Sequence, residues 1–164
     1  MKAQEKVLTL DEAAAWSAQA RAAGKRVVAT NGCFDILHVG HVRYLEHARR
    51  LGDALIVGIN GDESVRDLKG EGRPLNQQRD RAEIISALAS VDTVVVFEEV
   101  RATRFLEAIQ PSLYVKGGDY SPDTLNPEEL AVLKRAGSQI QIIPFESGYS
   151  TTGLLDRLKP GKDG

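Results

Sequence analysis

Short runs of apolar, often β-branched residues alternate along the chain with longer segments that have helical periodicity. Examples of the short runs are KRVVAT at residues 25–30 and ALIVGIN at residues 54–60. Continuous apolar runs of this kind are typical of strands that are buried on both faces of a sheet. Strands that alternate with helices favour a parallel sheet covered by helices on both sides. The pattern therefore predicts a three-layer, Rossmann-like α/β fold with a five-stranded parallel sheet, its strands at residues 25–30, 54–60, 91–97, 113–116 and 139–145.

The segments between these strands carry helix start and stop signals. Thr9 and Glu12 have the spacing of a capping box, and Asn126 followed by Pro127 is a strong helix start. Helices are expected between residues 9 and 24 and at 41–51, 76–90, 102–110, 126–137 and 152–158, whereas the glycine- and proline-containing stretch 62–75 is expected to be a loop. We expect a helical extension at 1–24, one domain at 25–158 and a disordered tail at 159–164.

The composition excludes several classes of protein. The 164 residues are 42% hydrophobic and 27% charged, which is typical of a globular domain and not of a disordered chain. A formal net charge of -2 gives no electrostatic footprint for nucleic acid or for an anionic membrane. The chain has no signal-peptide pattern and no apolar run of the roughly 20 residues that a membrane helix needs. With Cys33 as its single cysteine, it is expected to be a soluble cytoplasmic protein.

The most informative motif follows the first predicted strand. His38, Val39, Gly40 and His41 lie at a strand-to-helix junction, in a loop where open α/β sheets bind their ligands. A helix N-terminus offers free N–H groups to a phosphate, and Gly40 lets the phosphate approach the backbone. Two imidazoles three residues apart can then converge on the same phosphoryl oxygens. The alternative is two unconnected histidines, one at the surface and one in the core; His47 is expected to be solvated.

These residues resemble the HxGH motif of the nucleotidyltransferase superfamily that includes the cytidylyltransferases. The fuller string TNGCFDILHVGH at residues 30–41, with YVKGGDY at 114–120 and STT at 150–152, is most similar to the adenylyltransferase domain of ADP-heptose synthase. The resemblance implies the transfer of an adenylyl group from ATP to D-glycero-D-manno-heptose 1-phosphate in lipopolysaccharide-core assembly, with Mg²⁺ as cofactor. It also implies a homodimer and a separate sugar kinase, since a kinase domain precedes this one in the bifunctional enzyme.

The resemblance assigns candidate site residues in three groups. The catalytic candidates are His38, His41, Lys69 and Arg79. The nucleotide-binding candidates are Asn31, Gly32, Cys33, Phe34, Gly40, Lys116, Ser150, Thr151 and Thr152. The candidates for the sugar phosphate are Asp35, Arg73, Gly118 and Asp119. The basic residues are included because a triphosphate and a sugar phosphate together bring several negative charges; Arg73 and Arg81 are weaker candidates than Lys69 and Arg79.

Several of these residues have plainer alternative roles. Asp35 either binds a substrate hydroxyl or turns its own loop, and Asp119 contacts either sugar hydroxyls or Mg²⁺. The basic residues also suit a solvated surface, and Ser150 suits a simple helix cap. Two alternative functions also remain. One is a nucleotidyltransferase that uses CTP or GTP with another sugar or polyol phosphate, and the other is a non-catalytic nucleotide-binding module, against which the paired histidines argue.

Overall fold

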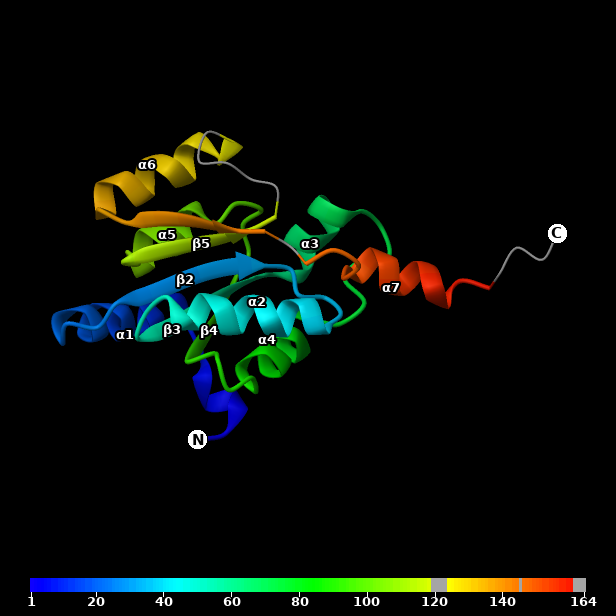
Figure 1. Cartoon of the computed structure of the whole chain (residues 1–164), viewed down its shortest axis with the longest axis horizontal. Helices are drawn as coiled ribbons and strands as arrows, with labels where there is room; N and C mark the ends of the chain where they lie inside the picture. Colours follow the sequence, from blue (N-terminus) through cyan, green and yellow to red (C-terminus); the bar gives the residue numbers. More distant parts are fainter. Residues whose placement is uncertain (119–123, 145, 161–164) are drawn as a thin grey trace.

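The strands form one parallel sheet in the order β1-β4-β3-β2-β5-β6 (Figure 1). The computed structural model describes residues 1–118, 124–144 and 146–160. Within these ranges the strands are β1 (Val7–Leu8), β2 (Val27–Gly32), β3 (Ala54–Asn60), β4 (Thr93–Phe97), β5 (Leu113–Gly117) and β6 (Gln139–Ile143). The parallel α/β architecture is as predicted.

The predicted number of strands is wrong, because the sheet has six strands and not five. The additional strand is β1, in which Val7 and Leu8 pair with Val94 and Val95 of β4. Two residues at the edge of a sheet are too short to produce a recognisable apolar run. Residues 1–24 therefore contribute a strand to the sheet as well as a helix.

Helices cover both faces of the sheet. They are the 3-10 helix η1 (Ala3–Lys6) and the α-helices α1 (Leu10–Ala22), α2 (Val39–Arg50), α3 (Asp62–Lys69), α4 (Gln78–Ser86), α5 (Thr103–Ile109), α6 (Pro127–Ala136) and α7 (Thr151–Leu158). Leu45 of α2 and Ile85 of α4 belong to the core on one face, whereas Phe105 of α5 and Leu133 of α6 belong to the core on the other. The two faces can be followed in Figure 1. No helix in the described ranges is both long and apolar enough to cross a membrane.

The segment 62–75 is not a loop throughout, because α3 occupies its first half. Asp62 and Glu63 lie in the first turn of α3 and Lys69 in the last, so the charges complement the helix dipole. Ser64 and Val65 are its buried residues. Val65 and Leu68 are its only large apolar residues, so the apolar stripe of α3 is short and easily missed in the sequence. Its position is determined by contacts with other segments.

The chain changes direction across β2. From β2 it continues through β3 to β4 on one side, and it then crosses through α5 to β5 on the other side of β2. In open α/β sheets with such a reversal, ligands bind beyond the carboxyl ends of the strands on either side of it, which are β2 and β5 here. The hydroxyl of Tyr114 donates to Asn31 Oδ1 at 2.5 Å and joins the two strands near this point. Helix α7 projects beyond the same end of the sheet (Figure 1).

Candidate functional site

The two histidines of the HxGH motif are in contact with each other. His38 is the N-cap residue of α2 and His41 lies in its first turn. The backbone N–H of His38 donates to Nδ1 of His41 at 3.3 Å. Their rings stack with a centroid separation of 3.8 Å and an interplanar angle of 23°. The structure thus brings together the two imidazoles that the spacing places at one helix start, while His47 is exposed farther along α2.

Both imidazoles are held in the neutral form at neutral pH. Burial, together with the nearby His38, lowers the pKa of His41 to about 4. Burial also lowers the pKa of His38. Because Nδ1 of His41 accepts a hydrogen bond, the ring proton of His41 is on Nε2, where it can be donated to a ligand. Nδ1 of His38 is buried and has no hydrogen-bond partner among the described residues.

Close packing surrounds the histidine pair. A Cβ atom at Gly40 would lie 2.9 Å from Nδ1 and Cε1 of His38 and 2.9 Å from Cβ of Tyr149. Phe34 packs edge-on against His41, with a centroid separation of 5.3 Å, and adopts a positive φ of 47°. A Cβ atom at Gly32 would lie 2.9 Å from the Phe34 ring. Gly32 and Gly40 are thus required by contacts within the protein, in addition to any approach of a phosphate.

Asp35 connects the loop after β2 to the segment before α4 through hydrogen bonds. Its side chain is 1% exposed and accepts from Arg73 Nε at 2.8 Å. The backbone N–H groups of Leu75 and Asn76 donate to the same carboxylate at 2.9 Å. Burial acts to raise the pKa of this carboxyl, but the hydrogen bonds from Asn76, Leu75 and Arg73 outweigh burial and the pKa is lowered. Asp35 therefore anchors two loops, and Arg73 is held at this site by Asp35.

Three cations surround the start of the same loop. Burial raises the pKa of the Cys33 thiol, while the charges of Lys69, Arg81 and Arg73 act in the opposite direction, so all three lie within electrostatic range of Cys33. Lys69 is the exposed last residue of α3. The raised pKa keeps Cys33 in the thiol form, which fits a small loop residue and not a nucleophile.

Arg79, a predicted catalytic residue, does not join this group. It is exposed on α4 and lines a surface hollow of about 410 Å³ together with Gln4, Val7 and Glu83. That hollow lies between α4 and the N-terminal segment, on the side of the sheet edge formed by β1. The structure thus gives no contact between Arg79 and the histidine loop.

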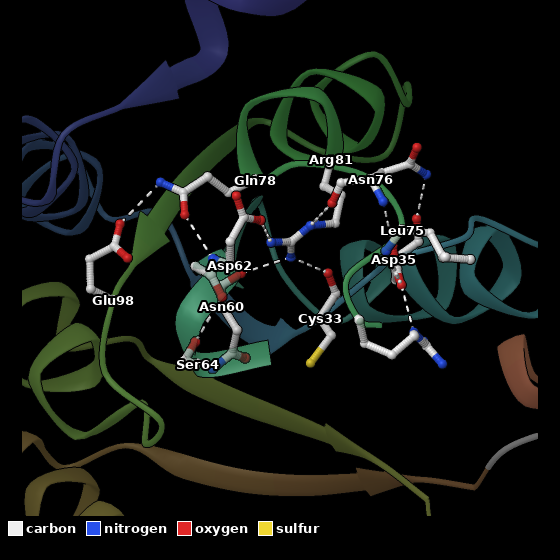
Figure 2. Close-up of polar contacts among 12 residues, drawn as sticks. Cys33, Asp35, Asn60, Asp62, Ser64, Leu75, Asn76, Gln78, Arg81 and Glu98 are labelled. Carbon is white, nitrogen blue, oxygen red and sulfur yellow. Dashed lines mark hydrogen bonds and ion pairs between the residues drawn. The ribbon is translucent and has the colours of Figure 1, made fainter. Parts of the chain in front are cut away.

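Arg81, one of the two weaker candidates, has a more central position. It is completely buried and donates four hydrogen bonds, as Figure 2 shows. The acceptors are the carbonyl oxygens of Asn76 at 2.9 Å, Cys33 at 2.7 Å and Asn60 at 2.7 Å, and Oδ1 of Asp62 at 2.8 Å. The sequence holds a signal for this burial, since Arg81 precedes the buried Ile85 by one helical turn.

The remaining candidates lie at the end of β5 and the start of α7. Lys116 is half-buried near the end of β5, and Gly118 has a φ of 107° and donates its N–H to the Ile143 carbonyl at 3.0 Å. Asp119 lies outside the described residues. Ser150 caps α7 by accepting from Gly153 N–H at 2.9 Å.

The start of α7 lies against the loop after β2. The hydroxyl of Thr151 donates to the Ile36 carbonyl at 3.2 Å. Arg43 of α2 pairs with Glu146 at 2.6 Å and lies 5.6 Å from the ring centroid of Tyr149. Thr152 is exposed. The helix starts of α2 and α7 therefore meet, and a ligand at His38 would lie close to both.

The described ranges contain no group of three His, Cys, Asp or Glu residues that could hold a metal ion. Asp35 in the loop after β2 and Asp62 at the start of α3 are already paired with Arg73 and Arg81. In the described part of the chain, the donor set therefore does not fit a resident metal bound by protein ligands alone.

Comparison with known proteins agrees with the geometry of the site. The cytidylyltransferase-like family model matches residues 29–157. The chain is 46% identical over 156 residues to the bifunctional protein HldE of Geotalea uraniireducens (strain Rf4), which covers 95% of this chain and 31% of that protein. It is 49% identical over 149 residues to the bifunctional protein HldE of Haemophilus influenzae (strain PittEE), with 89% and 30% covered. The chain thus spans about a third of the length of these relatives.

A solved structure is also similar. It is the crystal structure of the lipopolysaccharide core biosynthesis protein from Thermoplasma volcanium GSS1, with a TM-score of 0.63 and 27% sequence identity. The match covers 77% of this chain and 100% of that one. The resemblance inferred from HxGH and its flanking motifs is confirmed at the level of the family: the chain belongs to the cytidylyltransferase-like family.

Proposed function

We propose that this protein is a nucleotidyltransferase that joins ATP and D-glycero-D-manno-heptose 1-phosphate to give ADP-heptose and pyrophosphate. The observation that carries the proposal is the stacked pair of His38 and His41 at the N-terminus of α2. This helix follows β2, the strand at which the chain changes direction across the sheet. The choice of sugar is supported by the identity to the HldE proteins and by the name of the similar solved structure.

In the proposed reaction an anionic oxygen of the sugar phosphate attacks the α-phosphorus of ATP. The bond between that phosphorus and the oxygen bridging to the β-phosphate breaks, and pyrophosphate leaves with the electron pair. The nucleophile needs no general base because it is already an anion. Catalysis then depends on orientation and on stabilising the charge at the α-phosphate.

The residues of the site have distinct proposed roles. His41 donates from Nε2 to a phosphoryl oxygen, His38 donates to the same group, and the free N–H groups of α2 add their positive dipole. Lys69 and Arg73 offset the charge of the triphosphate and of the sugar phosphate. Because the bound anions favour the charged imidazoles, we expect nucleotide binding to raise the pKa of both histidines.

The proposed nucleotide contacts come from β2 and the loop after it, from β5 and from the starts of α2 and α7. They are Asn31, Gly32, Phe34, Gly40, Lys116, Ser150, Thr151 and Thr152. Gly118 and Asp119 are proposed for the sugar phosphate. Mg²⁺ would neutralise part of the charge of the triphosphate, and no cluster of described residues would hold it without the nucleotide.

The proposal extends to the setting of the enzyme. We place it in the cytoplasm as a homodimer, without nucleic-acid or membrane partners. Its sugar substrate carries an anomeric phosphate, so a sugar kinase activity must supply it. A second candidate is a cytidylyltransferase acting on another sugar or polyol phosphate, which the family match favours because its name refers to cytidylyl transfer.

The test is a panel of ATP, CTP, GTP and UTP against both anomers of heptose 1-phosphate, read by pyrophosphate release. We expect turnover with ATP and one anomer. Faster turnover with CTP identifies the second candidate, whereas binding of nucleotide without pyrophosphate release with any sugar or polyol phosphate identifies a non-catalytic module.

A further inference from the structure

Arg81 is a charged residue that lies entirely inside the protein. A guanidinium ion is costly to bury unless its N–H groups are paired, and removing a single partner leaves a buried charge or donor without compensation. Arg81 meets this requirement with four hydrogen bonds of 2.7 to 2.9 Å. Its acceptors come from three separate segments of the chain: the start of the loop after β2, the junction of β3 and α3, and the segment before α4.

The first two acceptors lie at the ends of adjacent strands. The carbonyl of Cys33 directly follows β2, and the carbonyl of Asn60 belongs to the last residue of β3. Both accept from the same nitrogen, Nη1 of Arg81, so the guanidinium joins the ends of the two strands. Asn60 is itself held, because its Nδ2 donates to the carbonyls of Glu99 and Val100 at 3.4 and 3.3 Å.

The ion pair with Asp62 fixes the start of α3. Asp62 is the first residue of this helix, and its own N–H donates to Oε1 of Gln78 at 2.8 Å. Gln78 in turn donates to Oε1 of Glu98 at 3.1 Å, and Figure 2 shows this chain of contacts. Lys69 lies at the opposite end of α3, so the direction of the helix determines where the Lys69 ammonium points.

The geometry points to Arg81 as a positioning residue for the proposed transfer reaction. By holding both segments, Arg81 places the histidine loop and Lys69 so that both can contact the same bound phosphate chain. Through Cys33 it fixes the first residue of the loop that leads to His38. Through Asp62 it fixes the helix that carries Lys69. This inference rests on the proposed function. It concerns how the histidine loop and α3 are placed relative to each other, and it does not depend on which base or sugar is bound.

Lysine at position 81 cannot make the same set of hydrogen bonds. Its ammonium has three donors on a single atom, whereas the four acceptors lie along the edges of a planar group. Arg81→Lys keeps the charge but loses the simultaneous contacts with Cys33, Asn60 and Asp62. The matched control is Arg135→Lys on α6, whose guanidinium is 69% exposed and is 3.6 Å from Glu107 in a surface ion pair.

Two readouts test the inference at a temperature where unfolding curves show each variant to be folded. Amide hydrogen exchange is expected to become faster in residues 33–38 and 62–69 of Arg81→Lys, and to be unchanged in Arg135→Lys. With substrates, we expect the kcat of Arg81→Lys to fall about tenfold or more, while both KM values change by less than about threefold. If hydrogen exchange in both segments of Arg81→Lys is the same as in the wild type, the inference is overturned, whatever the substrate is. Turnover of the wild-type protein, measured in the same experiment, tests the proposed function separately.

A second variant decides the case if Arg81→Lys does not fold. Asp62→Asn keeps the shape of the acceptor, which is 33% exposed, and removes only its charge. We expect faster exchange in residues 62–69 and a smaller fall in kcat than for Arg81→Lys, again with little change in KM. A folded Asp62→Asn variant with wild-type exchange and wild-type kcat contradicts the positioning role, as does a defect confined to KM.

Discussion

The backbone N–H of His38 donates to Nδ1 of His41, so the residue that caps α2 also fixes the tautomer of the histidine one turn later. This bond leaves the Nε2 proton of His41 available for donation. The two rings stack on each other at the start of the helix, with a centroid separation of 3.8 Å.

Burial of His41 makes stability depend on pH. The unfolded state takes up a proton near the ordinary pKa of 6.5, whereas the folded state does so only near 4. The contribution of the neutral imidazole is therefore complete above pH 6.5 and is lost as the pH falls toward 4. We expect at most roughly 3 kcal/mol of loss over this window. Urea unfolding at pH 7.5 and pH 5 measures the first part of this loss, at most roughly 2 kcal/mol. His41→Gln should show a smaller loss than His47→Ala, and equal losses contradict the prediction.

Asp35 is expected to be the most important carboxylate for folding. Asp35→Asn puts amide hydrogens opposite the N–H donors of Leu75 and Asn76 and leaves Arg73 without its ion pair. We expect unfolding to become easier by about 2–3 kcal/mol. Because its pKa is lowered in the folded protein, this contribution is present above the ordinary pKa of 3.8 and is lost as the pH falls through the folded pKa.

Asp156→Asn serves as the control, because Asp156 forms an exposed ion pair with Lys159 on α7. Such pairs contribute between about 0 and 1 kcal/mol. Chemical denaturation of both variants at pH 7 is the measurement. A loss below about 1 kcal/mol in Asp35→Asn would show that other contacts hold the two loops together.

Gly40→Ala tests the packing around the histidine pair. In an open helical position alanine is more stable than glycine by about 1 kcal/mol. Here the added Cβ would lie 2.9 Å from the His38 ring and 2.9 Å from Cβ of Tyr149, so these side chains must move. We expect a net destabilisation of about 1–2 kcal/mol and a lower kcat. A more stable variant with unchanged kcat rules out this account of Gly40.

The strands that could be predicted are those with a visible apolar pattern in their own sequence. Every residue of β3 is buried, and its sequence shows an apolar run from Ala54 to Ile59. The strand β1 and the helix α3 could not be found in this way, since the first has two residues and the second is mostly charged. Both are positioned by partners that are distant in sequence. The same limit applies to the candidate site.

HxGH could be recognised because its chemistry is concentrated in adjacent residues. Among the basic residues, helical spacing places Arg81 on the buried face of α4 and Arg79 on the exposed face, since they are two residues apart on one helix. The spacing does not show what Arg81 contacts. The acceptors that hold Arg81 come from Cys33, Asn60 and Asp62, and no local pattern indicates that these residues meet.

Turnover is expected to depend on a divalent metal ion. The described residues form no cluster of metal ligands, so we expect ligand-free protein to show no tight Mg²⁺ binding by calorimetry. Excess chelator should abolish turnover, and added Mg²⁺ should restore it, because the ion binds with the triphosphate. Tight binding of Mg²⁺ in the absence of ATP, or full turnover in chelator, contradicts this prediction.

The most direct test of the proposed chemistry compares His41→Ala with His47→Ala in the pyrophosphate-release assay. Both substitutions remove a histidine from α2, but only His41 stacks on His38. For His41→Ala we expect kcat to fall by on the order of 10² to 10³, with a much smaller change in the KM for ATP, because the lost donor stabilises the transition state more than the bound substrate. For His47→Ala we expect wild-type kinetics. A folded His41→Ala protein that keeps wild-type kcat would contradict the assignment of this histidine pair as the catalytic centre.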